Sequence, residues 1–185
     1  MRDPQIPRAR SADSLLWPGM INSPRVELVE TSFDDPIVTG LHVEQAAELA
    51  ARFGADADRP PVAEPGTVFL VARERGEPIG CAGVRWVAAA GGQPSGGQGA
   101  EVGQIYVRPE YRGIGVTRLL LRGAEDLARR RGCRIARLKA ADLRDAGLYE
   151  SSGYVRIPPF GSHPPRSLCF EKTLRAEAGP RPPSP

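Results

Sequence analysis

A short glycine-containing segment in the middle of the chain has the composition of an anion-binding turn. Residues 112–117 read Arg-Gly-Ile-Gly-Val-Thr and lie between a β-prone run and a helical pattern. Gly113 and Gly115 let the backbone approach a ligand closely, and the first amides of the following helix have no intrahelical partner. Such helix N-termini suit phosphate or pyrophosphate, and Arg112 adds a positive charge beside them. The segment therefore predicts a phosphate site, or else a plain strand-to-helix turn that binds nothing.

The elements on either side of this turn follow from hydrophobic spacing. A helix is predicted by apolar residues at i, i+3, i+4, i+8 and i+11, which are Val116, Leu119, Leu120, Ala124 and Leu127. Three arginines at 129–131 and then Gly132 are typical of a helix end. The β-prone run before the turn predicts a strand over 102–107, and a second such run follows the helix over 134–140. Together they predict a βαβ crossover with parallel pairing.

The rest of the chain predicts a mixed α/β sheet, because strands come before, between and after helices. Asp34 and Asp35 before Pro36 predict the start of a helix that continues to Phe53, and Asp142 is expected to cap a short helix through Ser151. Further strands are predicted over 25–31, 67–73, 78–88, 153–156 and 167–174. We expect a flexible arm over 1–24, a single domain over 25–175, a mobile loop over 89–100 and a disordered tail over 176–185. Met20 is a second candidate for the natural start.

The composition is that of an ordinary globular protein. Of the 185 residues, 41% are hydrophobic and 25% are charged, and no apolar run approaches the roughly 20 residues of a membrane-spanning helix. The N-terminal region lacks the apolar segment of a secretory signal. Cys81, Cys133 and Cys169 lack metal-ligand spacing, which predicts buried, reduced thiols, no metal site and a cytoplasmic location.

A cluster of five arginines between positions 129 and 137 raises the question of nucleic-acid binding. The net charge is only +3, and no aromatic residues interleave with these arginines, as a base-stacking platform would require. We therefore favour a solvated helix end, and expect neither a nucleic-acid nor a membrane partner.

Two segments together carry a resemblance to a known family. The segment YVRPEYRGIGV at 106–116, with its long helix, and the segment AGLYESSGY at 146–154 resemble the two signature regions of the GNAT superfamily of acyl-CoA-dependent N-acetyltransferases. The phosphate motif of that family is Arg or Gln, two residues, Gly, one residue, then Gly or Ala. Arg112 and Gly115 match this motif, whereas Thr117 stands where a small residue is usual. The resemblance covers roughly residues 67–174.

The resemblance implies a fold, a reaction and a cofactor. The fold would be a central, mostly antiparallel sheet with one parallel splayed pair, flanked by helices. The reaction would be transfer of an acetyl group from acetyl-CoA to a primary amine by direct attack, without a metal. Residues implied to bind the cofactor are Ile105, Tyr106 and Val107 along the pantetheine arm, and Arg112, Gly113, Ile114, Gly115, Val116 and Thr117 at the pyrophosphate.

The resemblance also implies catalytic residues. Tyr149 matches the tyrosine that protonates the departing thiolate in many members, although its ring would also suit packing against the sheet. Asp142 either accepts a hydrogen bond from the cofactor or caps a helix, the latter being favoured. Glu101 matches a position where relatives often place a glutamate base, acting directly or through water, but a solvated glutamate would fit equally. His42 and His163 are the other candidates for a base near neutral pH.

The acceptor pocket is expected to lie among residues 33–53, 55–66 and 157–166. The candidate acceptor-binding residues are Phe33, Phe160 and His163. Four acidic residues could attract a cationic amine, or could simply be solvated; they are Asp34, Asp35, Glu44 and Glu48. We expect a small-molecule amine or an amino-terminal group as the acceptor. Members of the family are often homodimers, so both a monomer and a homodimer remain open.

Two other functions compete with this one. A dinucleotide-binding oxidoreductase would use Gly113 and Gly115 as the first two glycines of its fingerprint, but Arg118 occupies the third position. A non-catalytic acyl-CoA-binding or regulatory module on the same fold is kept open by Thr117 and Asp142, the two departures from the pattern of the family.

Overall fold

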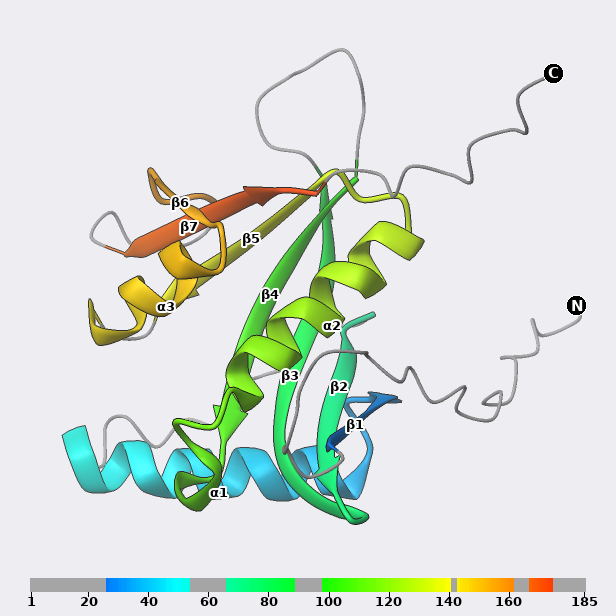
Figure 1. The fold of residues 1–185 in the computed structure, drawn as a ribbon, viewed down its shortest axis with the longest axis vertical. Coiled ribbons are helices and arrows are strands. Elements are labelled where there is room, and N and C mark those ends of the chain that lie inside the picture. Colours follow the sequence, from blue (N-terminus) through cyan, green and yellow to red (C-terminus); the bar gives the residue numbers. More distant parts are fainter. Residues whose placement is uncertain (1–25, 54–65, 89–97, 141–142, 162–166, 175–185) are drawn as a thin grey trace, which may run out of the picture.

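A mixed sheet of seven strands is formed by the described part of the chain, residues 26–53, 66–88, 98–140, 143–161 and 167–174 of a computed structural model (Figure 1). The strands lie in the order β1-β2-β3-β4-β5-β7-β6. Their bounds are β1 Val26–Ser32, β2 Val68–Glu74, β3 Glu77–Ala88, β4 Gln98–Val107, β5 Ile135–Ala140, β6 Val155–Ile157 and β7 Leu168–Thr173. Only β4 and β5 are parallel among these neighbours, which confirms the predicted crossover.

The parallel pair is splayed. Gly99–Val102 of β4 pairs with Ile135–Leu138 of β5, and no pairing with β5 is recorded for residues 103–107. In Figure 1 the two strands start together and then run apart. A register shift opposite Cys81 and Gly83, and a positive φ of 51° at Gln104, bend β4 where the separation begins. An opening between two strands of one sheet results.

Two long helices cover opposite faces of the sheet. They are α1 (Pro36–Phe53) and α2 (Val116–Arg130). Successive side chains of β2 point to opposite faces of the sheet. Leu70 belongs to the core cluster under α2, whereas Phe69 and Val71 belong to the cluster under α1. α1 begins as predicted, since the Asp35 carboxylate accepts the Ile37 N–H at 2.8 Å.

Two boundaries differ from the sequence-based expectation. Residues 98–100 belong to β4 and not to the glycine-rich loop. A Cβ on Gly99 would come within 3.1 Å of Ile135 and 3.4 Å of Val87, so this glycine permits close packing between strands and does not mark a loop. The short helix α3 spans Ala146–Ser151 and follows a 3-10 turn at Leu143–Asp145. Asp142, the arm over 1–24 and the tail over 176–185 lie outside the described residues.

The arginines near the end of α2 are largely exposed, as expected of a solvated helix end, and they also have partners within the chain. Arg129 binds Asp126 at 2.5 Å, Arg130 binds Glu30, and the Arg131 guanidinium lies 5.0 Å from the centre of the Trp86 ring. All three cysteines are buried and free of disulfides, as predicted. None of the described helices is long and apolar enough to cross a bilayer.

Candidate functional site

The turn between β4 and α2 is held by two left-handed glycines. Gly113 has a φ of 79°, and Gly115, the residue that precedes α2, has a φ of 94°. A Cβ atom on either glycine would find nothing within 4 Å beyond its own chain neighbours, so the backbone conformation, and not crowding, requires glycine here. No side chain caps the start of α2. The first amides of the helix therefore keep their capacity to bind an anion.

A surface depression of about 180 Å³ lies over this turn. It is lined by Tyr111, Arg112, Gly113, Gly115, Val116, Thr117, Arg118 and Leu148. Leu148 belongs to α3, so the depression connects the start of α2 with the helix that follows the splayed strand β5. Ile114, on the same turn, is half exposed. The structure thus brings most of the predicted pyrophosphate residues around one hollow.

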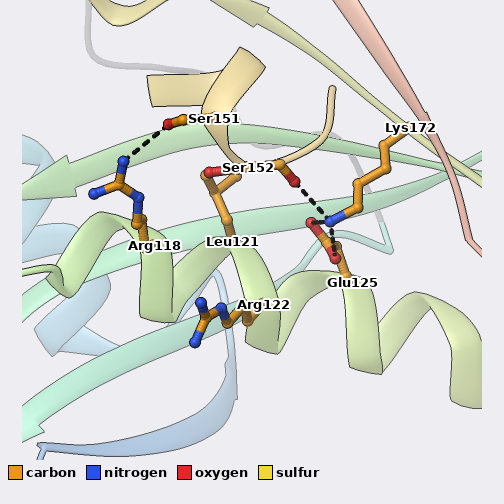
Figure 2. A pocket seen from close by; sticks show the side chains of 7 residues that line it. All are labelled: Arg118, Leu121, Arg122, Glu125, Ser151, Ser152 and Lys172. Atoms are coloured by element: carbon orange, nitrogen blue, oxygen red, sulfur yellow. Dashed lines mark hydrogen bonds and ion pairs between the residues drawn. The ribbon is translucent and has the colours of Figure 1, made fainter. Parts of the chain in front are cut away.

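A second depression of about 200 Å³ shares Arg118 with the first and continues between α2, α3 and β7 (Figure 2). Arg118 donates to the Ser151 hydroxyl at 2.8 Å, and Arg122 lies one turn further along α2. Lys172 donates to the buried carboxylate of Glu125 at 2.7 and 2.8 Å, which compensates its charge. Two arginines therefore line a groove that leads away from the turn before α2.

The Arg112 side chain is engaged within the chain. Its Nε donates to the Val107 carbonyl at 2.8 Å, and its terminal nitrogens donate to the Glu48 carboxylate at 2.8 and 2.5 Å. The bond between them raises the pKa of Arg112 and lowers the pKa of Glu48. Arg108 binds Glu44 in the same bidentate way, at 2.8 and 2.7 Å. Arg112 lines the depression, but its charge is already paired, and both glutamates fasten α1 to the turn.

Tyr149 is buried on α3, next to Leu148, which lines the depression over the turn. Its ring lies 5.6 Å from that of Phe170 and 6.3 Å from that of Tyr154, measured between centroids. Burial, with a smaller contribution from Asp145, raises the pKa of Tyr149 to about 12. The hydroxyl therefore keeps its proton at neutral pH, as a proton donor must.

Glu101 belongs to a row of alternating charges across four strands. Arg85 of β3, Glu101 of β4, Arg137 of β5 and Glu171 of β7 stand directly opposite one another in register. Arg85 binds Glu101 at 2.5 Å, and the Arg137 Nε binds Glu171 at 2.7 Å. Opposite charges at facing positions stabilise a sheet. Glu101 is thus a fixed carboxylate and not a solvated one.

The candidate acceptor residues lie on different elements. Phe33 packs against Phe69 at 5.9 Å between ring centroids, beside α1. Phe160 receives the Arg137 guanidinium 5.4 Å from its ring centre, beside β5. His163 lies outside the described residues. His42 is 3% exposed and packs edge-on against Phe69 at 5.3 Å, which favours a packing role for it over that of a base.

The burial of His42 predicts acid-sensitive stability. Burial lowers the pKa of His42 below its ordinary value of 6.5, so below that pH the unfolded chain binds a proton that the folded chain excludes. Stability is therefore complete above about pH 6.5 and falls as the pH drops, by at most about 1.4 kcal/mol per pH unit from this residue. The free energy of unfolding, measured with urea at about pH 5 and about pH 7.5, should differ less between the two pH values for His42→Leu than for the unaltered chain. If the two chains show the same difference, His42 does not carry this pH dependence.

Gln45 was missed by the sequence analysis. The Tyr106 carbonyl faces β3, because it lies 2.6 Å from the Cβ position of Gly80, so the neighbouring carbonyls of Ile105 and Val107 face the opening between β4 and β5. Gln45 of α1 donates to the Ile105 carbonyl at 3.4 Å. The signal was present, because Gln45 lies midway between Leu41 and Leu49 in the apolar stripe of the helix.

Comparisons with known proteins agree with this geometry. The model of the acetyltransferase (GNAT) family matches residues 33–154. A protein of Azospirillum brasilense named IAA acetyltransferase is 34% identical over 121 residues, which are 63% of this chain and 74% of that protein.

Solved structures agree on the fold. A Klebsiella pneumoniae structure assigned as an acyl-CoA N-acyltransferase superposes with a TM-score of 0.63 at 22% identity, over 81% of this chain and 98% of the other. The PaiA N-acetyltransferase of Thermoplasma acidophilum, solved in complex with coenzyme A, superposes with a TM-score of 0.58 at 17% identity, over 80% of this chain and 99% of the other.

Proposed function

Since this chain belongs to the acetyltransferase (GNAT) family and is an N-acetyltransferase that uses acetyl-CoA, we propose that it acetylates the primary amine of a small molecule by direct attack. The observation that carries the proposal is the hollow over Gly113 and Gly115, where left-handed glycines leave room beside unsatisfied helix amides. The name of the Azospirillum brasilense relative supports a small-molecule acceptor.

The residues present fit acetyl-CoA. The amides of residues 113–117 would hold the pyrophosphate, and the edge of β4 at Ile105–Val107 would pair with the pantetheine arm. Arg118 and Arg122 lie in the groove that continues from the hollow. They would face the phosphate group of acetyl-CoA that is not part of the pyrophosphate. Fixed positive charges and helix amides are the groups that bind phosphates in proteins.

The chain supplies the two proton transfers of the reaction. The amine, once deprotonated, attacks the thioester carbonyl, a C–N bond forms and the C–S bond breaks. Tyr149 donates its hydroxyl proton to the departing sulfur. The newly acylated nitrogen releases its extra proton, which returns through solvent to the Tyr149 oxygen. The thiolate leaves into the same apolar surroundings that raise the pKa of Tyr149, and burial raises the proton affinity of the sulfur as well. Glu101, which Arg85 holds in place, takes the proton of the amine through a water molecule.

A ligand titration followed by an acceptor screen tests the proposal. Acetyl-CoA should raise the melting temperature of the purified chain in proportion to the logarithm of its concentration above Kd, whereas NAD should not. Release of the CoA thiol should then be followed with a polyamine, an arylalkylamine, an amino acid and a peptide with a free amino terminus. No stabilisation at roughly millimolar acetyl-CoA, where sites as weak as about −4 kcal/mol fill, would contradict the proposal. Acetylation of the peptide, with no turnover of any of the small amines, would also contradict the proposal.

A further inference from the structure

A buried carboxylate lies on α2 where that helix faces α3 and β7. Glu125 is the only acidic side chain that is buried among the residues the structure describes, with 3% of its surface exposed. It accepts two hydrogen bonds from Lys172 of β7. Withdrawing an ion pair from water is costly, and apolar side chains of similar volume often give equal or greater stability. Stability alone therefore does not account for a buried ion pair at this place.

The ammonium group of Lys172 joins three elements at one point (Figure 2). It donates to the two carboxylate oxygens of Glu125 at 2.7 and 2.8 Å, and to the backbone carbonyl of Ser152 at 2.8 Å. Ser152 is the residue at which α3 ends. An ammonium group has three N–H donors, so all three are used within the chain. Glu125 thereby fixes the direction in which the third donor points.

The short helix α3 depends on such contacts for its position. It has only six residues and no side chain caps its start, and helices of this length are not stable by themselves. The N–H groups of Ser152 and Tyr154 both donate to the Tyr149 carbonyl, at 3.0 and 3.1 Å. The backbone that Lys172 holds is therefore bonded directly to the residue that carries the proposed acid, and a shift of Ser152 moves Tyr149.

The proton transfer requires an accurate position of the Tyr149 hydroxyl. A general acid must lie within about 3 Å of the atom that it protonates, and a misplacement of about 1 Å can lower a rate by up to roughly 100-fold. The ring of Tyr149 packs against Phe170 and Tyr154, and apolar packing is non-directional. The hydrogen bond from Lys172 is directional. It therefore supplies a constraint that the ring contacts do not.

We propose that Lys172, oriented by Glu125, is a positioning residue for Tyr149: it fixes the end of α3 so that the Tyr149 hydroxyl lies within hydrogen-bond reach of the departing sulfur. The inference rests on the proposed function, and it adds two residues that touch none of the reacting atoms. Lys172 also lines the groove beyond the turn. Its donors are used within the chain, so we expect no contribution from it to the affinity for acetyl-CoA.

The test replaces both members of the pair with apolar side chains, Glu125→Leu and Lys172→Met, because removing Lys172 alone would leave a buried charge without a partner. This paired variant should keep the melting temperature of the unaltered chain. The probes are acetyl-CoA and the amine of the screen with the highest turnover, both at saturating concentration. The kcat should fall roughly tenfold, whereas the Kd for acetyl-CoA, measured by calorimetry, should stay unchanged.

The same paired substitution in a Tyr149→Phe chain separates positioning from a general structural role. If Lys172 acts through the Tyr149 hydroxyl, nothing is left to misplace once that hydroxyl is gone. The kcat of Tyr149→Phe should then fall no further, and the two losses should be non-additive. A merely structural role would lower kcat by the same factor in both chains, which would overturn the inference.

The ion pair between Arg130 and Glu30 provides a matched control. It joins the end of α2 to β1, which lies at the other end of the sheet from β6 and β7. Arg130→Met with Glu30→Leu removes both charges of this pair and should leave kcat unchanged. A fall in kcat as large as that of the paired variant would mean that any ion pair of α2 has this effect, and the inference would be wrong.

Three further results would overturn it: an unchanged kcat in the paired variant, a loss of acetyl-CoA affinity as large as the loss of kcat, and a paired variant that no longer folds, since the pair would then serve the fold itself. Failure of the proposed function is distinguishable, because it appears in chains that keep the pair. The unaltered chain would bind no acetyl-CoA or turn over no amine, or Tyr149→Phe would retain its full kcat.

Discussion

Replacing Tyr149 with phenylalanine should lower kcat by roughly 100-fold, the lower end of what a positioned general acid contributes. The ring packing against Phe170 and Tyr154 survives the substitution, so the fold and the affinity for acetyl-CoA should be retained. The measurement is thiol release at saturating acetyl-CoA, together with a calorimetric Kd. Because the pKa of Tyr149 is raised to about 12, its loss of a proton should not limit the unaltered enzyme at pH values near neutrality.

Tyr154→Phe is the matched control for this substitution. It removes a buried hydroxyl from the same aromatic cluster, but Tyr154 has no part in the proposed proton transfers. Its kcat should remain near that of the unaltered chain. Equal losses in the two variants would show that the cluster supports the fold and that Tyr149 is not the acid. A chain with no turnover to lose would instead behave as an acyl-CoA-binding module.

Replacing Gly115 with alanine should weaken acetyl-CoA binding roughly 10- to 100-fold, because one or two charge-assisted hydrogen bonds to the pyrophosphate would be lost. The φ of 94° is unfavourable for any residue with a Cβ. The backbone would turn away, and the new methyl group would project into the space that the anion needs. Stability should fall by about 1 kcal/mol.

Gly76→Ala separates the two effects. Gly76 lies in the turn between β2 and β3, has a φ of 87° and, like Gly115, has nothing within 4 Å of its Cβ position. Both variants should lose similar stability in urea unfolding, but only Gly115→Ala should lose affinity for acetyl-CoA in calorimetry. Comparable affinities in the two variants would mean that the turn does not hold the pyrophosphate.

Local patterns in the sequence were sufficient for most of the elements. The predicted start of α2 at Val116 is the observed one, because apolar spacing and the preceding glycines act within one stretch of chain. The start of β4 was placed four residues late, at 102 instead of Gln98. The glycines at this position predict a loop. Only the neighbouring strands show that a glycine is needed at position 99, because Ile135 and Val87 leave little room for a side chain there.

The sequence by itself also determined the family and the turn over residues 113–117, since both depend on glycines and on spacing within a short segment. Only the tertiary structure decided the partners of the side chains around that turn. Arg112 is paired with Glu48, which lies 64 residues away, and Gln45 contacts the Ile105 carbonyl across 60 residues. These contacts depend on how α1 docks on the sheet and on how far β4 and β5 separate. Spacing within a segment determines which face of a helix is apolar, but not which polar groups a distant strand presents to it.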